Sequence, residues 1–312
     1  MAQHEIPLER RTLHGHFSRE LEPVLTVDSG DSIAFSCLHA GWRGATNERF
    51  AERRAEGDPL DAGHALIGPV EVRGAVAGKT LEVRIDEVRV GSWGVTDAGG
   101  WHTPLNERLG VVDGETVTFD WELDHDARTG RDQAGRQVAL APFLGVIGMP
   151  PDEPGVHSTA PPRRSGGNID CKELVEGTKL YLPIPVSGAL LSAGDGHAAQ
   201  GDGEVAQLAI ETPLERAQLT LSVRDDLRLE WPIAWTPDAW LTFGFDEDLD
   251  EAVAIAIEGM LDLMVREHGL GRRDALGLAS VVVDLRVTQM VNGARGAHAV
   301  LPHDAVRFTT IG

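Results

Sequence analysis

Several runs of this chain alternate apolar and polar or small residues with a period of two, and this pattern most constrains the fold. Such alternation is typical of strands that turn one face to a core and the other to solvent. The chain also contains 36 glycines and 17 prolines, which separate the runs. Short strands divided by turn residues favour a mainly β, antiparallel sandwich or barrel-like body. The predicted strands lie at 33–37, 81–85, 117–123, 219–223 and 281–287.

One segment breaks the alternation. From Leu249 to His268, apolar residues recur at every fourth position, as on one face of an α-helix. Asp248 can cap the start of this helix and Gly269 its end, and a shorter helix is expected at 272–279. We interpret the apolar stripe as core packing rather than a partner-binding face. The predicted organisation is therefore a β-rich body at 1–224, a small α+β insert at 225–280 that carries the long amphipathic helix, and C-terminal strands at 281–312 that return to the body.

Charge and composition exclude several classes of protein. The formal net charge is −21, which argues against binding to nucleic acid or to anionic membrane surfaces. Two cysteines cannot form a disulfide framework for 312 residues. No stretch approaches the length of a membrane span, and the first residues lack the apolar core of a signal peptide. The sequence therefore predicts a cytoplasmic protein.

The segment 194–204 gathers one imidazole and three carboxylates among four glycines. Asp195 and His197 are two residues apart, as are Asp202 and Glu204. In an extended chain this spacing puts both members of a pair on the same face. A turn between the pairs would bring all four side chains together. Such a cluster suits a divalent metal ion or general acid–base chemistry.

The surroundings of this segment bear on its interpretation. The apolar run 181–191 is predicted to form a buried strand that leads into the cluster. Ionisable groups at the end of a buried strand more often have a function than serve only as solvated surface residues. The alternative is a calcium-binding loop or a solvated turn on a non-catalytic or sugar-binding β-sandwich.

Several ordered sequence blocks follow one another along the chain. They are Gly68-Pro-Val-Glu-Val-Arg-Gly-Ala75, Gly145-Val-Ile-Gly-Met-Pro-Pro151, Gly166-Gly-Asn-Ile-Asp170, the run 180–190 and the segment 194–204. With these blocks the chain resembles the acetamidase/formamidase family over roughly residues 24–293. The resemblance implies a sandwich with a small α+β insert, hydrolysis of small linear amides, and self-association as a homodimer. Where many relatives carry an acidic residue after the early strand, this chain has His39.

The sequence also limits the possible mechanisms of amide hydrolysis. It contains no Gly-x-Ser-x-Gly elbow, no His-Glu-x-x-His motif and no Cys-x-x-Cys pair. Cys171, Lys172 and Glu173 could be imagined as a nucleophilic set, but adjacent residues on a strand point apart. We therefore expect neither cysteine to be the nucleophile. A metal-activated water remains, with zinc as the first choice and calcium as the alternative.

We assign roles to the candidate residues on this basis. Cyclic amides or other C–N bonds stay open as variants of the substrate. His14 and His16 have a spacing that can chelate a metal, but an exposed or packing role is favoured for them. The expected metal ligands are Asp195 and His197, then His39 and His64; the base and proton shuttle is Glu204 or else Asp202; and the substrate or the ligands contact Gly167, Asn168 and Asp170.

Overall fold

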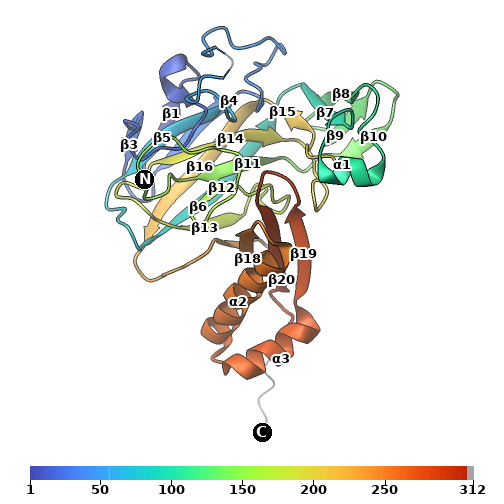
Figure 1. Ribbon diagram of the computed structural model, residues 1–312. Coiled ribbons are helices and arrows are strands. Elements are labelled where there is room, and N and C mark those ends of the chain that lie inside the picture. The colour runs from blue at the N-terminus through green and yellow to red at the C-terminus, as the bar shows by residue number, and fades with distance from the viewer. Residues whose placement is uncertain (56, 308–312) are drawn as a thin grey trace.

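The computed structural model describes residues 1–55 and 57–307, and two large β-sheets form its body (Figure 1). In sheet order, the nine strands described for the first sheet are β1 (Gln3–Ile6), β4 (Ser32–Cys37), β16 (Leu214–Arg224), β6 (Thr80–Val90), β13 (Lys179–Pro183), β17 (Ile233–Trp235), β18 (Ala239–Asp246), β20 (Arg295–Pro302) and β19 (Asp284–Gln289). The second sheet runs β10 (Gln137–Ala139), β9 (Thr129–Asp132), β8 (Val117–Asp124), β7 (Trp93–Ala98), β15 (Glu211–Thr212), β14 (Leu191–His197), β11 (Phe143–Gly148) and β12 (Gly166–Asn168), and it also includes β5 (Leu66–Val72), β2 (Leu13–His14) and β3 (Leu25–Val27). The short helices η1 (Arg10–Thr12) and α1 (Pro104–Leu109) lie in connections.

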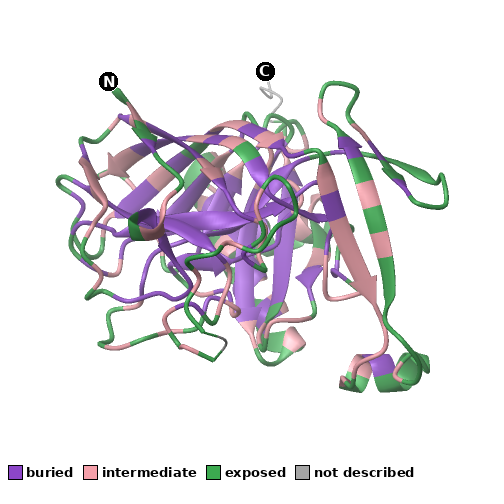
Figure 2. Ribbon diagram, turned by 90° about the horizontal axis from the view of Figure 1, so that it is seen from above, coloured by how far each residue is buried: buried purple, intermediate pink, exposed green. Residues whose placement is uncertain are grey.

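The main hydrophobic core contains side chains from both sheets. Phe35 and Ile85 come from the first sheet, and Ile67 and Leu144 come from the second; all four are at most 2% exposed and belong to one cluster. Figure 2 shows that buried residues dominate the strands of the body. The predicted mainly β, sandwich-like architecture is therefore confirmed, and the alternating runs supply its core.

The strand predicted at 117–123 forms as β8, but it lies at an exposed end of the second sheet (Figure 2). Val117 is 56% exposed, whereas Leu123 is buried. The alternation here indicates the right element, although its apolar face is only partly covered.

The run 181–191 is not the single strand that its composition predicts. It contributes to β13, which ends at Pro183 and pairs with β6 and β17, and to the start of β14 at Leu191 in the other sheet. Between them, Gly188, Ala189 and Leu190 all have positive φ, so the chain turns sharply. Asp195 and His197 consequently lie within β14 and not beyond the end of a strand.

The predicted long helix forms as α2 (Leu249–His268). The side chain of Asp248 accepts a hydrogen bond at its start, and Gly269 ends it with a φ of 64°. Leu261 and its neighbours are buried in a second core against β18 and β20, so the apolar stripe is used within the chain and the homodimer stays a prediction. None of the described helices is long and apolar enough to cross a membrane.

The last two strands belong to the same part of the molecule as the helices. The shorter helix α3 (Arg272–Val282) runs three residues further than expected, and β19 and β20 follow it. Strand β20 lies between β18 and β19, with His298 opposite Phe243. These strands extend the first sheet at its far edge (Figure 1), and Gln289 of β19 also forms an isolated parallel bridge with Gly203. The three-part division of the chain stays a prediction.

Candidate active site

Strand β14 places Asp195 and His197 side by side in the interior, as their i, i+2 spacing predicts. They are 2% and 1% exposed, and Asp195 Oδ2 lies 3.3 Å from His197 Nε2. Gly145 of the neighbouring strand β11 makes room for this pair. A Cβ at Gly145 would lie 2.5 Å from Asp195 Oδ2 and 2.7 Å from Asp170 Oδ1. The site therefore needs a residue without a side chain at this position.

Glu211 is a site residue that the sequence analysis did not identify. It lies on β15, directly opposite His197 in the antiparallel register, and its Oε1 is 3.2 Å from His197 Nε2. Glu211 is 3% exposed. The signal in the sequence was weak, since a single carboxylate in an otherwise apolar stretch belongs to no recognised motif. Only strand pairing brings it to the imidazole.

Two more carboxylates reach His197 from loops. Asp170 follows β12, and its Oδ1 lies 4.0 Å from His197 Nδ1. Glu204 follows a turn after β14 and has an oxygen within 4.8 Å of both a His197 nitrogen and a Glu211 oxygen. Asp170, Asp195 and Glu204 have φ values of 52°, 60° and 45°, which are unusual for residues other than glycine. Such backbone strain clusters at functional sites.

Hydrogen bonds fix the orientation of the imidazole. His197 Nδ1 donates to Gln200 Oε1 over 3.0 Å, and Gln200 Nε2 donates to the backbone oxygen of Asp170 over 2.7 Å. With the Nδ1 proton used in this way, the lone pair of Nε2 points toward Asp195 and Glu211. A lone pair that faces two carboxylates requires a cation between them, either a proton or a metal ion.

Asp170 also accepts a hydrogen bond from a distant part of the sequence. Asn292, in the turn between β19 and β20, donates from Nδ2 to Asp170 Oδ2 over 2.8 Å. In the sequence, Asn292 and Gly293 look only like a turn signal, so this contact could not be expected.

Unpartnered polar atoms concentrate around this cluster, although buried polar groups without a partner are rare in proteins. Two overlapping groups, Asp170–Asp195–His197 and His197–Glu204–Glu211, each have donor atoms within 4.8 Å of one another. An imidazole nitrogen with several carboxylate oxygens fits a divalent metal such as zinc. The buried atoms without a hydrogen-bond partner include His39 Nε2, Asn168 Oδ1, Asp170 Oδ1, Asp195 Oδ1, Glu204 Oε2 and Glu211 Oε2.

The electrostatics of the cluster indicate an excess of negative charge. Burial raises the pKa of Asp170 well above its usual value, and the charge of Glu204 adds to this effect. Burial also raises the pKa of Glu204 to about 8. The pKa of His197 is raised well above its usual value because Glu211 and Asp195 outweigh the opposite effect of burial. For Asp195, burial acts to raise the pKa, but the interactions with His197, His64 and Glu211 together outweigh it and lower the pKa. One imidazole cannot neutralise four carboxylates.

His39 lies beside the cluster, and its ring is oriented so that Nε2 can donate a hydrogen bond. Its Nδ1 accepts a hydrogen bond of 2.8 Å from the Gly41 backbone, and its ring stacks on Trp93 at 5.4 Å. Burial lowers the pKa of His39, although the charges of Glu211 and Asp195 act in the opposite direction. The imidazole is therefore neutral, with its proton on Nε2. This arrangement presents an N–H group rather than the lone pair that a metal ligand needs.

His64 lies in the wall of a cavity of about 560 Å³. Arg53, His157 and Thr159 also line this cavity. His64 Nδ1 is 2.7 Å from Thr159 Oγ1, which orients the ring. Electrostatic interaction with His64 contributes to lowering the pKa of Asp195.

Asp202 is not brought to the cluster. Its Oδ2 pairs with Lys172 Nζ at 2.9 Å, and its side chain is 32% exposed. The segment around it forms a turn and not a strand, so the i, i+2 rule does not place Asp202 beside Glu204. Gly167 and Asn168 are buried on β12, opposite β11, next to the chain that leads to Asp170.

The cysteines are poor candidates for a nucleophile. Burial raises the pKa of Cys37 to about 12. Burial also raises the pKa of Cys171 well above its usual value, and the charge of Glu173 adds to this effect. A thiol needs a lowered pKa to act as a nucleophile. The prediction that neither cysteine attacks the substrate has this support and stays a prediction.

Comparison with known proteins identifies the family. The sequence pattern of the Acetamidase/Formamidase family matches residues 2–158 and 152–234. The chain is 28% identical to an acetamidase from Bacillus halodurans, with a TM-score of 0.82 over 95% of this chain and 97% of that one. It is 27% identical to a predicted acetamidase/formamidase from Thermoanaerobacter tengcongensis, with a TM-score of 0.81 over 97% and 96% of the two chains.

A shorter segment is more similar to a curated relative. Over 47 residues the chain is 51% identical to an acetamidase of Mycolicibacterium smegmatis, which covers 15% of this chain and 12% of that protein. The family match and the structural similarity extend over most of the chain. This protein therefore belongs to the acetamidase/formamidase family and is an amidohydrolase that acts on linear amide C–N bonds.

Proposed function

We propose that this amidohydrolase works with a divalent metal ion, zinc in the first place, held by His197, Asp195 and Glu211 with Asp170 nearby. The observation that carries the proposal is the lone pair of His197 Nε2, which faces oxygens of Asp195 and Glu211 at 3.3 and 3.2 Å. When bound, such an ion supplies polarisation of the amide carbonyl and a water acidic enough to attack at neutral pH. Calcium is the weaker choice because it prefers six to eight oxygens and no imidazole.

Glu204 is the proposed base and proton shuttle. Its Oε2 is buried without a partner, and its pKa of about 8 lies near neutrality. A group with such a pKa can take a proton from the attacking water and return it to the departing nitrogen. The balanced reaction adds water across the C–N bond and releases a carboxylic acid and ammonia.

His39 is the proposed donor to the substrate oxygen. Its neutral ring keeps the proton on Nε2, which is buried without a partner beside the carboxylates. An N–H group held in a dry site stabilises negative charge that develops on a carbonyl oxygen during attack. In this assignment His39 contacts the substrate, and it does not hold the metal.

The proposed substrates are small linear amides of the acetamide and formamide class. The names of the similar proteins support this choice. Gly167 and Asn168 are proposed to line the acyl end of the substrate. Cyclic amides are the variant to compare.

Metal analysis combined with ammonia release tests the proposal. The purified protein should contain a divalent metal, lose activity on chelation, and release ammonia from acetamide or formamide faster than it opens a five-membered lactam, whose hydrolysis gives an amino acid and no ammonia. His197→Ala should lose both metal and turnover while keeping its circular dichroism spectrum. His102→Ala is the control, because the side chain of His102 is exposed and lies beside Glu107, which is exposed as well. Full turnover by a metal-free His197→Ala protein would contradict the metal-dependent mechanism.

A further inference from the structure

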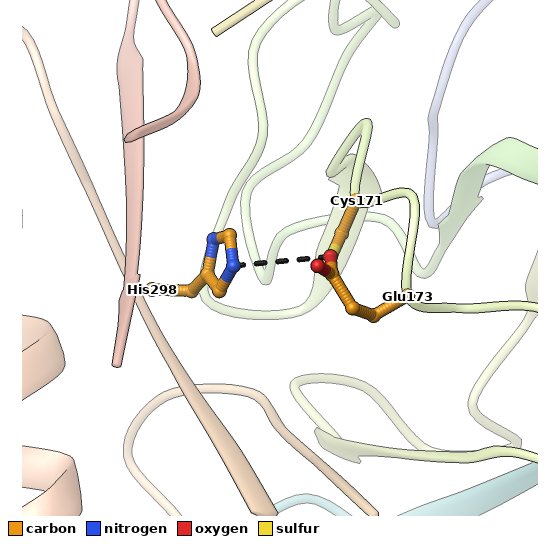
Figure 3. Close-up of side chains that lie close together, drawn as sticks. All are labelled: Cys171, Glu173 and His298. Carbon is orange, nitrogen blue, oxygen red and sulfur yellow. Dashed lines mark hydrogen bonds and ion pairs between the residues drawn. The ribbon is translucent and has the colours of Figure 1, made fainter. Parts of the chain in front are cut away.

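A second cluster of possible metal ligands lies between the segment that follows β12 and strand β20 (Figure 3). Cys171 and Glu173 come from the segment that follows β12, and His298 comes from β20. Cys171 Sγ lies 3.2 Å from Glu173 Oε2, and His298 Nε2 lies 3.8 Å from the same oxygen. All three donor atoms are within 4.8 Å of one another. The acidic cluster around His197 uses none of these side chains.

His298 is oriented toward this cluster by a hydrogen bond on its far side. The ring is fully buried, and Nδ1 is 2.8 Å from Thr288 Oγ1. Nε2 is buried without a hydrogen-bond partner, and Figure 3 shows it turned toward Glu173 and the sulfur of Cys171. Histidines that bind metals are commonly fixed by such a bond through the other ring nitrogen.

The neighbouring positive side chain pairs with one oxygen of Glu173, and the other oxygen accepts a hydrogen bond from the Cys171 thiol. Arg286 donates to Glu173 Oε1 over 2.8 Å, so Oε2 faces the thiol and the imidazole. Lys172, the other nearby cation, pairs with Asp202. The hydrogen bond of Arg286 goes to Oε1 and the ion pair of Lys172 goes to Asp202, so Oε2 is the oxygen near the thiol and the imidazole.

The chemistry of the three donors favours a zinc-like ion. Sulfur, imidazole nitrogen and carboxylate oxygen are all zinc ligands. Around a tetrahedral zinc ion with ordinary bond lengths, a sulfur and an oxygen ligand lie roughly 3.6 Å apart and a nitrogen and an oxygen ligand roughly 3.4 Å apart. The Sγ–Oε2 separation of 3.2 Å is shorter and the Nε2–Oε2 separation of 3.8 Å is longer, so side-chain shifts of about 0.4 Å would accommodate the ion. Calcium and magnesium are disfavoured, because hard cations avoid thiolate sulfur.

We propose that Cys171, Glu173 and His298 form a second site for a zinc-class transition metal, which joins β20 to the body. Binding replaces the thiol proton of Cys171 with the metal ion, and the proton passes to solvent. A water completes the coordination, since the side chain of Glu173 is 19% exposed. The site is separate from the catalytic cluster and does not depend on the proposed reaction.

Cobalt loading of the full chain tests this site. After chelation and dialysis, Co²⁺ should give thiolate-to-cobalt absorption in the near ultraviolet, together with one metal equivalent beyond that of the catalytic cluster. The chain has only two cysteines, so only Cys171 or Cys37 can be the source. Cys171→Ser should lose the absorption and one equivalent, whereas Cys37→Ser, the matched buried control, should keep both.

The His197→Ala background separates this site from the catalytic one. There the cobalt absorption should persist with about one equivalent of metal, and adding His298→Gln should abolish it. Three outcomes would overturn the proposal: a wild-type protein without thiolate absorption at saturating Co²⁺, absorption that survives Cys171→Ser, or absorption that disappears with His197→Ala although that variant is folded. The wild-type measurement needs no substitution, so a variant that fails to fold does not prevent the test.

Discussion

His14 and His197 are both buried near β14, but their hydrogen-bond partners and their pKa values differ. His14 is 4% exposed; its Nδ1 donates to the His16 backbone oxygen, and its Nε2 accepts from Ser192 at the start of β14. Burial lowers the pKa of His14 to about 4. His197, at the end of β14, has a pKa raised well above its usual value because Glu211 and Asp195 outweigh burial. The surroundings, not the burial, separate a structural imidazole from a functional one.

The difference also lies in whether polar atoms are satisfied. Both nitrogens of His14 have neutral partners, so nothing remains for a ligand to bind. Around His197, carboxylate oxygens of Asp195 and Glu211 stay without partners in the interior. Unsatisfied buried groups are costly, and a folded protein keeps them where a ligand or a reaction uses them.

The largest expected effect comes from neutralising the proposed base. Glu204→Gln keeps the shape of the side chain but cannot accept a proton, so turnover should fall by about 10²–10⁴ while bound metal is retained. Ammonia release and metal content measured on the same sample check this. If metal is lost together with activity, Glu204 is a ligand and not the base.

The second-largest loss of turnover is expected when a side chain fills the space beside the His197 cluster. Gly145→Ala places a methyl group within 2.5 Å of Asp195 Oδ2, so ligands must shift, and turnover should fall by about 10²-fold. Gly277→Ala is the control, since Gly277 lies in α3 with open space around it. The alanine there should be neutral or stabilising. Equal activity for both variants would show that the cluster tolerates displacement.

The surroundings of His14 predict an effect on stability in acid. Its pKa is about 4 when folded and 6.5 when unfolded, so between these values the unfolded chain binds a proton that the folded chain does not. Stability should therefore fall as pH decreases from about 6.5 to 4, by roughly 3 kcal/mol from this group. Urea unfolding across this range should show a shallower loss for His14→Gln. An equal slope for both proteins would contradict the neutral state of His14.

The smallest effect is expected at Asp202. Its carboxylate pairs with Lys172 near the surface, and such pairs contribute about 0–1 kcal/mol to stability. Asp202→Asn should change turnover by less than about 3-fold, whereas Glu204→Gln, two residues away, removes most of it. Steady-state ammonia release compares the two variants. A large loss of turnover in Asp202→Asn would restore it as a candidate base.

Part of this site could be predicted from local sequence because it depends on local geometry. Asp195 and His197 are two residues apart in an extended strand, so they share a face wherever that strand lies. The helix α2 is similar, since its periodicity and its two caps lie within one continuous segment. The same rule fails for Asp202 and Glu204, because the chain there is a turn with Glu204 at positive φ.

Local sequence patterns were therefore enough to predict the mainly β class, the long helix, the family and the pair at the centre of the site. The carboxylates that join that pair could be identified only from the folded chain. Glu211 arrives through the register of β15 on β14, and Asn292 reaches Asp170 across 122 positions of sequence. The run 181–191 is divided between the two sheets, and Gly145 leaves room for the carboxylates of Asp195 and Asp170. Neither feature could be predicted from local sequence. Long-range strand pairing brings these residues together, and no local pattern of polarity specifies which strands pair.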